Sequence, residues 1–241
     1  VAATIASLTP TAVDTDGSMK VAIAAAGAIP PLIRLLRADL EGVQKSAARA
    51  LHNLTSKNAE NKVTVLESGA LEPLIKLLKR GMPPVKEQAV CVLRNLTGGS
   101  LNNKKLVAES GAIPVVVNLL KQTVDSPILV HISVILYNLA NNSSERKGAC
   151  IAVGAIPALI KLLAEGKPEV KKEAADTLRI LGHDSSQACM DIVAAGGAKP
   201  LAAMLASDIP DAKRRATLLR DTLAKFGGAG VKAALASAKA V

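Results

Sequence analysis

The chain has 241 residues, enough for one or two ordinary domains and too many for a small fold that depends on disulfides or a metal. It contains no Trp, one Tyr and one Phe, which argues against a platform that stacks nucleic-acid bases on aromatic rings. The formal charge of +10 favours acidic partners, although acidic residues are interleaved with basic ones as on an ordinary solvated surface.

A short phrase that opens on glycine recurs five times along the chain. The five copies are Gly27-Ala28-Ile29-Pro30, Gly69-Ala70-Leu71-Glu72, Gly111-Ala112-Ile113-Pro114, Gly154-Ala155-Ile156-Pro157 and Gly197-Ala198-Lys199-Pro200. Their glycines are 42, 42, 43 and 43 residues apart. Because glycine tolerates the left-handed backbone of a sharp turn, each phrase predicts a turn between two helices. Such a period, filled with short apolar helical segments, is typical of a helical solenoid.

Each interval between these glycines predicts three helices, as the second one shows. Residues 60–68 form a short amphipathic stretch that Gly69 ends. Residues 71–78 carry apolar side chains at helical spacing, with Pro73 in the first turn, where its missing N–H costs nothing. Residues 85–96 place apolar side chains on one face of a longer helix. We therefore expect an all-α fold of repeated three-helix units.

The whole chain, 1–241, is predicted to form a single array of such units. Its expected divisions are the end of a partial repeat and a linker at 1–19, repeats at 20–59, 60–102, 103–145, 146–186 and 187–230, and the start of a further repeat at 231–241. Ile5 to Thr9 matches the end of a third helix, and the stretch from Gly227 to Gly230 is predicted to be a turn between helices. Because the chain starts with Val and both ends fall within a unit, we expect it to be a piece of a longer protein.

These units resemble armadillo repeats. The Glu60-Asn61-Lys62 phrase together with the Gly-Ala-Ile-Pro turn is closest to the armadillo arrays of plant and algal proteins, including those joined to U-box ubiquitin ligases. The resemblance covers essentially the whole chain. It implies a right-handed superhelical solenoid whose third helices line a concave groove for extended peptides or partner proteins. The two-helix HEAT repeat fits less well, because a distinct short helix precedes each glycine.

A second phrase closes the third helices of the first four units. It reads Leu51-His52-Asn53-Leu54, Leu93-Arg94-Asn95-Leu96, Leu136-Tyr137-Asn138-Leu139 and Leu178-Arg179-Ile180-Leu181. By resemblance, Asn53, Asn95 and Asn138 match the asparagine ladder that clamps peptide backbones in armadillo grooves, since an amide both donates and accepts hydrogen bonds. The alternative interpretation is that each Asn caps the end of its own helix.

Armadillo proteins of the importin-alpha type carry tryptophans four residues before these asparagines. The matching positions here are Arg49, Cys91, Val134 and Asp176, so we do not expect nuclear-import cargo to bind. Arginines on the third helices would repel a basic peptide and favour acidic or phosphorylated segments. The residues to test first are Arg49, His52, Arg94, Tyr137 and Arg179, although each of them taken alone also suits a solvated surface.

No enzymatic, cofactor or metal motif is expected. The histidines lack HExxH spacing, and the three cysteines lack CxxC spacing and fall at apolar positions, which indicates packing. Because three cysteines without CxxC spacing encode no disulfide framework, we expect an intracellular protein, with the cytoplasm first and the nucleus or an organelle as alternatives. No apolar run is long enough to predict a membrane span.

The leading hypothesis is a non-enzymatic protein–protein interaction scaffold that binds an extended, acidic partner segment in a mildly basic concave groove. One alternative is the substrate-recruiting armadillo region of a larger U-box ubiquitin ligase. Another is a structural subunit of a large algal or plant assembly. Nucleic-acid binding ranks below all three, because no aromatic residues accompany the basic ones.

Overall fold

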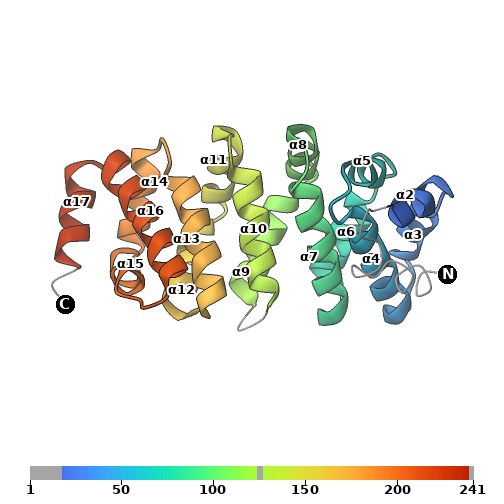
Figure 1. Cartoon of the computed structure of the whole chain (residues 1–241), viewed down its shortest axis with the longest axis horizontal. Coiled ribbons are helices and arrows are strands. Elements are labelled where there is room, and N and C mark those ends of the chain that lie inside the picture. The colour runs from blue at the N-terminus through green and yellow to red at the C-terminus, as the bar shows by residue number, and fades with distance from the viewer. Residues whose placement is uncertain (1–17, 124–126, 239–241) are drawn as a thin grey trace. The chain divides into compact units, whose positions relative to one another are not determined.

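The computed structural model describes residues 18–123 and 127–238, which hold sixteen α-helices and no strand (Figure 1). The predicted all-α class is thereby confirmed. The chain divides into two compact units, 1–115 and 116–241, which are described separately below. The predicted third-helix end at Ile5 to Thr9 lies outside the described residues.

The first unit repeats a sequence of three helices, which are a short first helix, a second or middle helix, and a long third helix. They are α2 (Ser18–Ala25), α3 (Ile29–Leu35), α4 (Glu41–Thr55), α5 (Ala59–Glu67), α6 (Leu71–Arg80), α7 (Pro83–Thr97) and α8 (Leu101–Glu109). The long helices α4 and α7 pack against each other, and each also contacts the middle helix before it and the short helix after it. Each long helix therefore has the position predicted for a third helix.

The second unit continues the same order. Helix α9 (Ala112–Gln122) crosses the boundary and is followed by α10 (Ile128–Ala140), α11 (Ser144–Ala152), α12 (Ala155–Glu165), α13 (Pro168–Gly182), α14 (Ser186–Ala194), α15 (Ala198–Leu205), α16 (Pro210–Phe226) and α17 (Gly228–Ser237). The third helices α10, α13 and α16 lie side by side (Figure 1). The predicted repeat boundaries remain a prediction.

Left-handed glycines form the turns between first and second helices. Gly27, Gly69, Gly111 and Gly154 have φ between +77° and +83°, as the recurring phrase predicts. The fifth turn was predicted one residue too late, because Gly196, with φ of +85°, takes this conformation instead of Gly197.

Gly197 is required for a different reason. A β-carbon there would lie 2.7 Å from the Ile160 Cδ1 atom and 2.7 Å from the Ile192 carbonyl oxygen. Two adjacent glycines thus serve two purposes, a backbone turn and a close approach between helices, which the sequence phrase alone does not separate.

The turn predicted from Gly227 to Gly230 is present but shorter than predicted. Only Gly228 is left-handed, with φ of +73°, and helix α17 starts at that residue, so Gly230 lies inside the helix. Helix α17 packs against α14, α15 and α16. Val231, which is 2% exposed, supplies the buried apolar contact that holds this helix there.

The first helices begin with a recurring cap. Lys57, Asn142 and Asp184 take left-handed backbone angles just before a capping residue. The caps are Asn58, Ser100, Ser143 and Ser185, whose side chains accept from the N–H three residues later. Each cap satisfies one of the unpaired N–H groups of a helix start and so fixes where that first helix begins.

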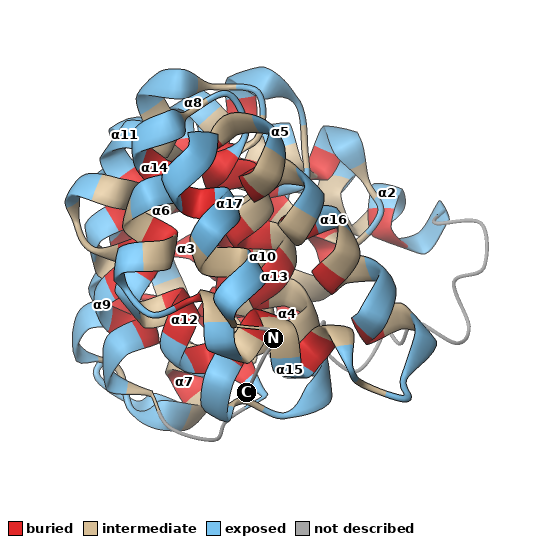
Figure 2. Ribbon diagram, turned by 90° about the vertical axis from the view of Figure 1, so that its left-hand side faces the viewer, coloured by how far each residue is buried: buried red, intermediate tan, exposed pale blue. Residues whose placement is uncertain are grey.

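The core is aliphatic in both units. Leucine, isoleucine, valine and alanine side chains on facing helices are fully buried, and the buried segments lie on helix faces turned toward neighbouring helices (Figure 2). Cys91, Cys150 and Cys189 are free thiols within this apolar packing. Burial raises the pKa of all three, and that of Cys150 to about 12.

Candidate functional site

The eight residues predicted to bind a partner all lie on third helices. In the first unit, α4 carries Arg49, His52 and Asn53, and α7 carries Arg94 and Asn95. In the second, α10 carries Tyr137 and Asn138, and α13 carries Arg179. Arg49 and Arg94 are exposed, and the other six are half-buried.

Asn95 joins two third helices. Its Nδ2 atom donates to the carbonyl oxygen of His52 at 3.0 Å and to the Thr55 hydroxyl at 3.2 Å. This arrangement differs from both sequence interpretations, because the amide neither caps its own helix nor keeps its donors for a partner. Its carbonyl oxygen accepts no hydrogen bond from the described residues, so Asn95 can offer a bound peptide an acceptor only.

Thr177 makes a comparable bond in the second unit. Its hydroxyl lies 3.0 Å from the Ser133 carbonyl oxygen on α10 and 2.8 Å from the Glu173 carbonyl oxygen on its own helix. Thr177 is fully buried and was not among the residues predicted from the sequence. Asn95 and Thr177 thus each bond their third helix to the neighbouring third helix of the same unit.

Asn61, from the phrase that marks the family resemblance, has a structural role. It is 2% exposed, and its Nδ2 atom donates to the carbonyl oxygens of Leu54 and Lys20 at 2.9 and 3.2 Å. In the Leu54 bond, the donor lies seven positions after the acceptor. The same spacing recurs in the second unit, where the Arg146 Nε atom donates to the Leu139 carbonyl oxygen at 2.6 Å. In the sequence, the sign of this structural role was that a polar residue recurs at the same place in the first helices, as Asn61 and Arg146 do.

The arginines differ in their charge surroundings. In the first unit, Arg49 and Arg94 form no ion pair with any described residue. In the second, Arg179 Nε lies 3.9 Å from a carboxylate oxygen of Asp176. The positive charge predicted for the groove is therefore left uncompensated at the first-unit arginines.

A carboxylate network surrounds Arg215 on α16. Its guanidinium hydrogen-bonds Asp176 of α13 and lies 3.7 Å from Glu173 and 3.4 Å from Asp211. Asp211 also receives a hydrogen bond from Arg214, and that bond, with nearby Lys172, lowers the pKa of Asp211. This network joins α13 to α16 and neutralises much of the local charge.

A polar cavity of about 410 Å³ lies where α10 and α13 end. Tyr137 and Arg179 both line it, so the structure brings together two residues that the sequence analysis selected. Lys147 of α11 lies beside them and donates to the His183 carbonyl oxygen at 2.9 Å. Lys147 was not among the residues predicted from the sequence.

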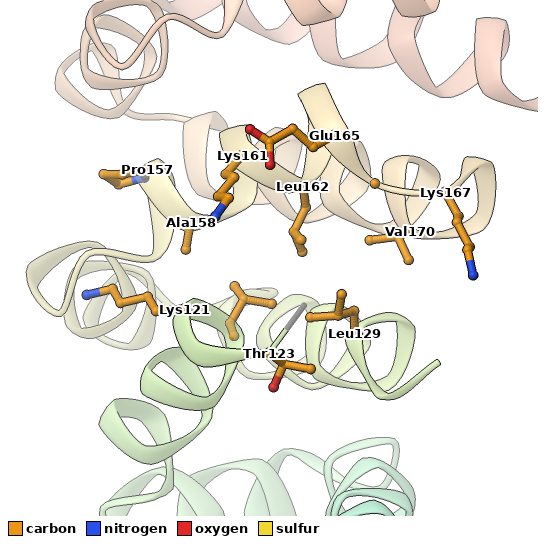
Figure 3. A pocket seen from close by; sticks show the side chains of 12 residues that line it. Lys121, Thr123, Leu129, Pro157, Ala158, Lys161, Leu162, Glu165, Lys167 and Val170 are labelled. Carbon is orange, nitrogen blue, oxygen red and sulfur yellow. The ribbon is translucent and has the colours of Figure 1, made fainter. Parts of the chain in front are cut away.

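An apolar cavity of about 240 Å³ lies at another edge of the second unit, between α9 and α12 (Figure 3). Leu129, Leu162 and Val170 face its interior, and Lys121 and Lys161 lie around it (Figure 3). Lys121 donates to the Val153 carbonyl oxygen at 2.8 Å. Thr123, Glu165 and Lys167 also line this cavity, so its wall combines apolar and polar side chains.

Within the described residues, no cluster of three or more His, Cys, Asp and Glu side chains could hold a metal ion. No single helix there is both long and apolar enough to cross a membrane, although three bent helix pairs meet the criteria of length and composition together.

The comparisons with known proteins agree with this geometry. The family model of the plant U-box protein ARM repeat region matches residues 2–216. The chain belongs to the armadillo repeat family. No curated protein sequence matches this armadillo array.

Solved structures resemble the armadillo array over most of its length. An engineered protein is 29% identical, with a TM-score of 0.85 and coverage of 93% of this chain and 90% of its own. A computationally designed armadillo repeat protein for modular peptide recognition is 26% identical, with a TM-score of 0.80 and coverage of 85% and 86%. A designed armadillo repeat protein in complex with the peptide (KR)4 is 26% identical, with a TM-score of 0.79 and coverage of 86% of each chain. The armadillo repeat fold is a protein-binding scaffold.

Proposed function

We propose that this armadillo array is a non-enzymatic scaffold that holds an extended, acidic segment of a partner protein across α4 and α7. The observation that carries the proposal is that Arg49 and Arg94 are exposed and form no ion pair with a described residue. An arginine fork meets a carboxylate or phosphate with two hydrogen bonds. The Asn95 carbonyl oxygen, which has no donor among those residues, can accept from the backbone of the same segment.

The designed relative bound to (KR)4 shows that an armadillo repeat protein can hold a basic peptide. This chain has no tryptophan to cover the stems of Lys and Arg side chains, and it places Arg49 and Arg94 on the third helices instead. Like charges would disfavour a basic ligand at that position. The proposed partner therefore has the opposite charge.

The test uses a double variant, Arg49→Gln with Arg94→Gln, and a fluorescent glutamate-rich peptide as the probe. The matched control, Lys76→Gln with Arg80→Gln, removes the same charge from exposed positions on α6 of the same unit. We expect the groove variant to weaken binding by about tenfold or more, because each lost charged hydrogen bond contributes about 1.5–3 kcal/mol. Equal losses in both variants would show that only net charge attracts the peptide.

A second candidate function is supported by the family match. We propose that the array recruits substrates for a U-box ubiquitin ligase, because the matching model describes armadillo regions of plant U-box proteins. The decisive test is the complete coding sequence together with a ubiquitin-transfer assay on the full-length protein. A full-length protein without a U-box and without transfer activity would eliminate this candidate and leave the scaffold proposal unaffected.

A further inference from the structure

The polar cavity at the ends of α10 and α13 is lined mainly by hydrogen-bonding groups. Its lining comprises Tyr137, Asn141, Asn142, Ser143, Ser144, Lys147, Arg179, Ile180, His183 and Asp184. Two of these residues, Lys147 and Arg179, are cationic, and Asp184 supplies the one carboxylate of the lining. The Asp184 Oδ2 atom lies 2.7 Å from His183 Nδ1, so this carboxylate already has a local partner.

Several donors at this cavity are not fully used by the protein. The Nε atom of Arg179 is buried and has no hydrogen-bond partner among the described residues, and a carboxylate oxygen of Asp176 lies 3.9 Å from it. Lys147 gives one hydrogen bond, to His183, which leaves two donors of its ammonium group. The Tyr137 hydroxyl has no hydrogen bond with a described residue. The terminal guanidinium nitrogens of Arg179, which lines the cavity, form no hydrogen bond with a described residue, so an oxygen-rich ligand can accept from them.

The beginning of α11 adds to the same electrostatic preference. Ser144, its first residue, lines the cavity, and Ser143 caps the helix by accepting from Arg146 N. Helix starts carry partial positive charge, which supplements the two cationic side chains. Asp184 opposes this preference, but two cations and a helix start outweigh a single carboxylate that is paired with His183.

We propose that this cavity binds a phosphomonoester dianion, with Arg179 and Lys147 as the charged ligands and Tyr137 as a neutral donor. An arginine fork and an ammonium group can together satisfy the oxygens of one phosphate. The inference rests on the proposed function in taking this phosphate from a phosphorylated residue of the bound partner. A volume of about 410 Å³ leaves room for neighbouring atoms of that partner besides the phosphate itself.

Tyr137 provides the measurement. It is the one tyrosine of a chain without tryptophan, so tyrosine emission reports on this cavity alone. The probes are inorganic phosphate, a phosphoserine peptide and the same peptide without phosphate. We expect a saturable change in emission with both phosphate-bearing probes and none with the unphosphorylated peptide.

Variants assign that signal to named residues. Arg179→Gln and Lys147→Gln are each expected to weaken phosphate binding by about tenfold, the loss of one charged hydrogen bond. Arg179→Lys keeps the charge but loses the fork, so we expect an intermediate loss with the fold retained. Lys161→Gln, an exposed position outside this cavity, removes the same charge and serves as the control. Circular dichroism melting of each variant separates loss of binding from loss of folding.

The titrations and variants together test whether the polar cavity binds phosphate. No saturable signal, or equal weakening in the Lys161 control, would overturn the proposal. Tighter binding of the phosphopeptide than of inorganic phosphate supports a partner protein as the source, and equal affinities overturn that assignment. A failed groove test at Arg49 and Arg94 would not change the Tyr137 titration, because those residues lie in the other unit.

Discussion

The side-chain amide of Asn95 donates to the backbone carbonyl oxygen of His52, and this bond of 3.0 Å joins α7 to α4. A second bond from the same Nδ2 atom reaches the Thr55 hydroxyl at 3.2 Å. The two acceptors lie 43 and 40 residues from the donor in sequence. A residue expected to hold a ligand therefore also joins the two third helices on which the site is predicted.

Asn95→Ala is expected to destabilise the protein by about 1–2 kcal/mol, because it removes two modest hydrogen bonds and leaves a half-buried carbonyl oxygen with one partner fewer. Urea unfolding followed by circular dichroism measures the change. The control is Asn102→Ala, on the exposed face of α8. Unchanged stability combined with weaker peptide binding would contradict the structural role and favour a peptide clamp.

Acid should weaken the carboxylate network on α16 in a predictable direction. The Arg214 hydrogen bond and nearby Lys172 lower the folded pKa of Asp211 below its unfolded value of about 3.9. A depressed folded pKa means that the ionised form stabilises the protein above the unfolded pKa. This contribution is lost as pH falls through the folded pKa.

Melting temperatures measured below about pH 4 are the check on that network. Asp211→Asn cannot titrate, so it is expected to melt lower than the parent protein near neutral pH and to lose less stability on acidification. Asp208→Asn, an exposed acid just before α16, is the control and should follow the parent. Parallel pH curves for parent and Asp211→Asn would show that Asp211 contributes nothing to acid sensitivity.

The helical fold was predictable because its signals are local. The spacing of apolar residues from Val85 to Leu96 corresponds to a long helix, α7, that spans Pro83–Thr97. Gly69 similarly occupies the turn that its phrase predicts. Such features depend on residues within one or two helical turns of each other.

The groove chemistry was less predictable because its partners are distant in sequence. Asp176, noted only as a position without tryptophan, bonds Arg215, 39 residues away. Arg179 looked equivalent to Arg94 in the repeated phrase, yet only Arg179 has a neighbouring carboxylate among the described residues. Adjacent Gly196 and Gly197 could not be assigned to the turn from sequence because both permit it. The structure places the left-handed turn at Gly196, whereas Gly197 is needed because a β-carbon there would meet Ile160.

The same substitution should have opposite effects at two glycines of the first unit. Gly69 has φ of +77°, a conformation that costs an L-residue about 1–2 kcal/mol, so Gly69→Ala should destabilise by that amount. Gly42 lies in α4 with ordinary helical angles, and a β-carbon added there would meet open space. Gly42→Ala should stabilise by about 0.4–1 kcal/mol, because it restricts the unfolded chain. Chemical denaturation of both variants tests the pair, and a shared sign would contradict the backbone assignment.

Thiol reactivity should report on the packing of the repeats. Cys150 and Cys189 are fully buried and Cys91 is 9% exposed, and burial raises the pKa of each thiol. Because the thiolate is the reactive form, we expect slow modification by a disulfide reagent at mildly alkaline pH, with Cys91 reacting first. In denaturant all three should react rapidly and at similar rates. Peptide mapping by mass spectrometry identifies the modified residue, and rapid labelling of Cys150 in the folded protein would show that the interior around α11 opens far more readily than its packing predicts.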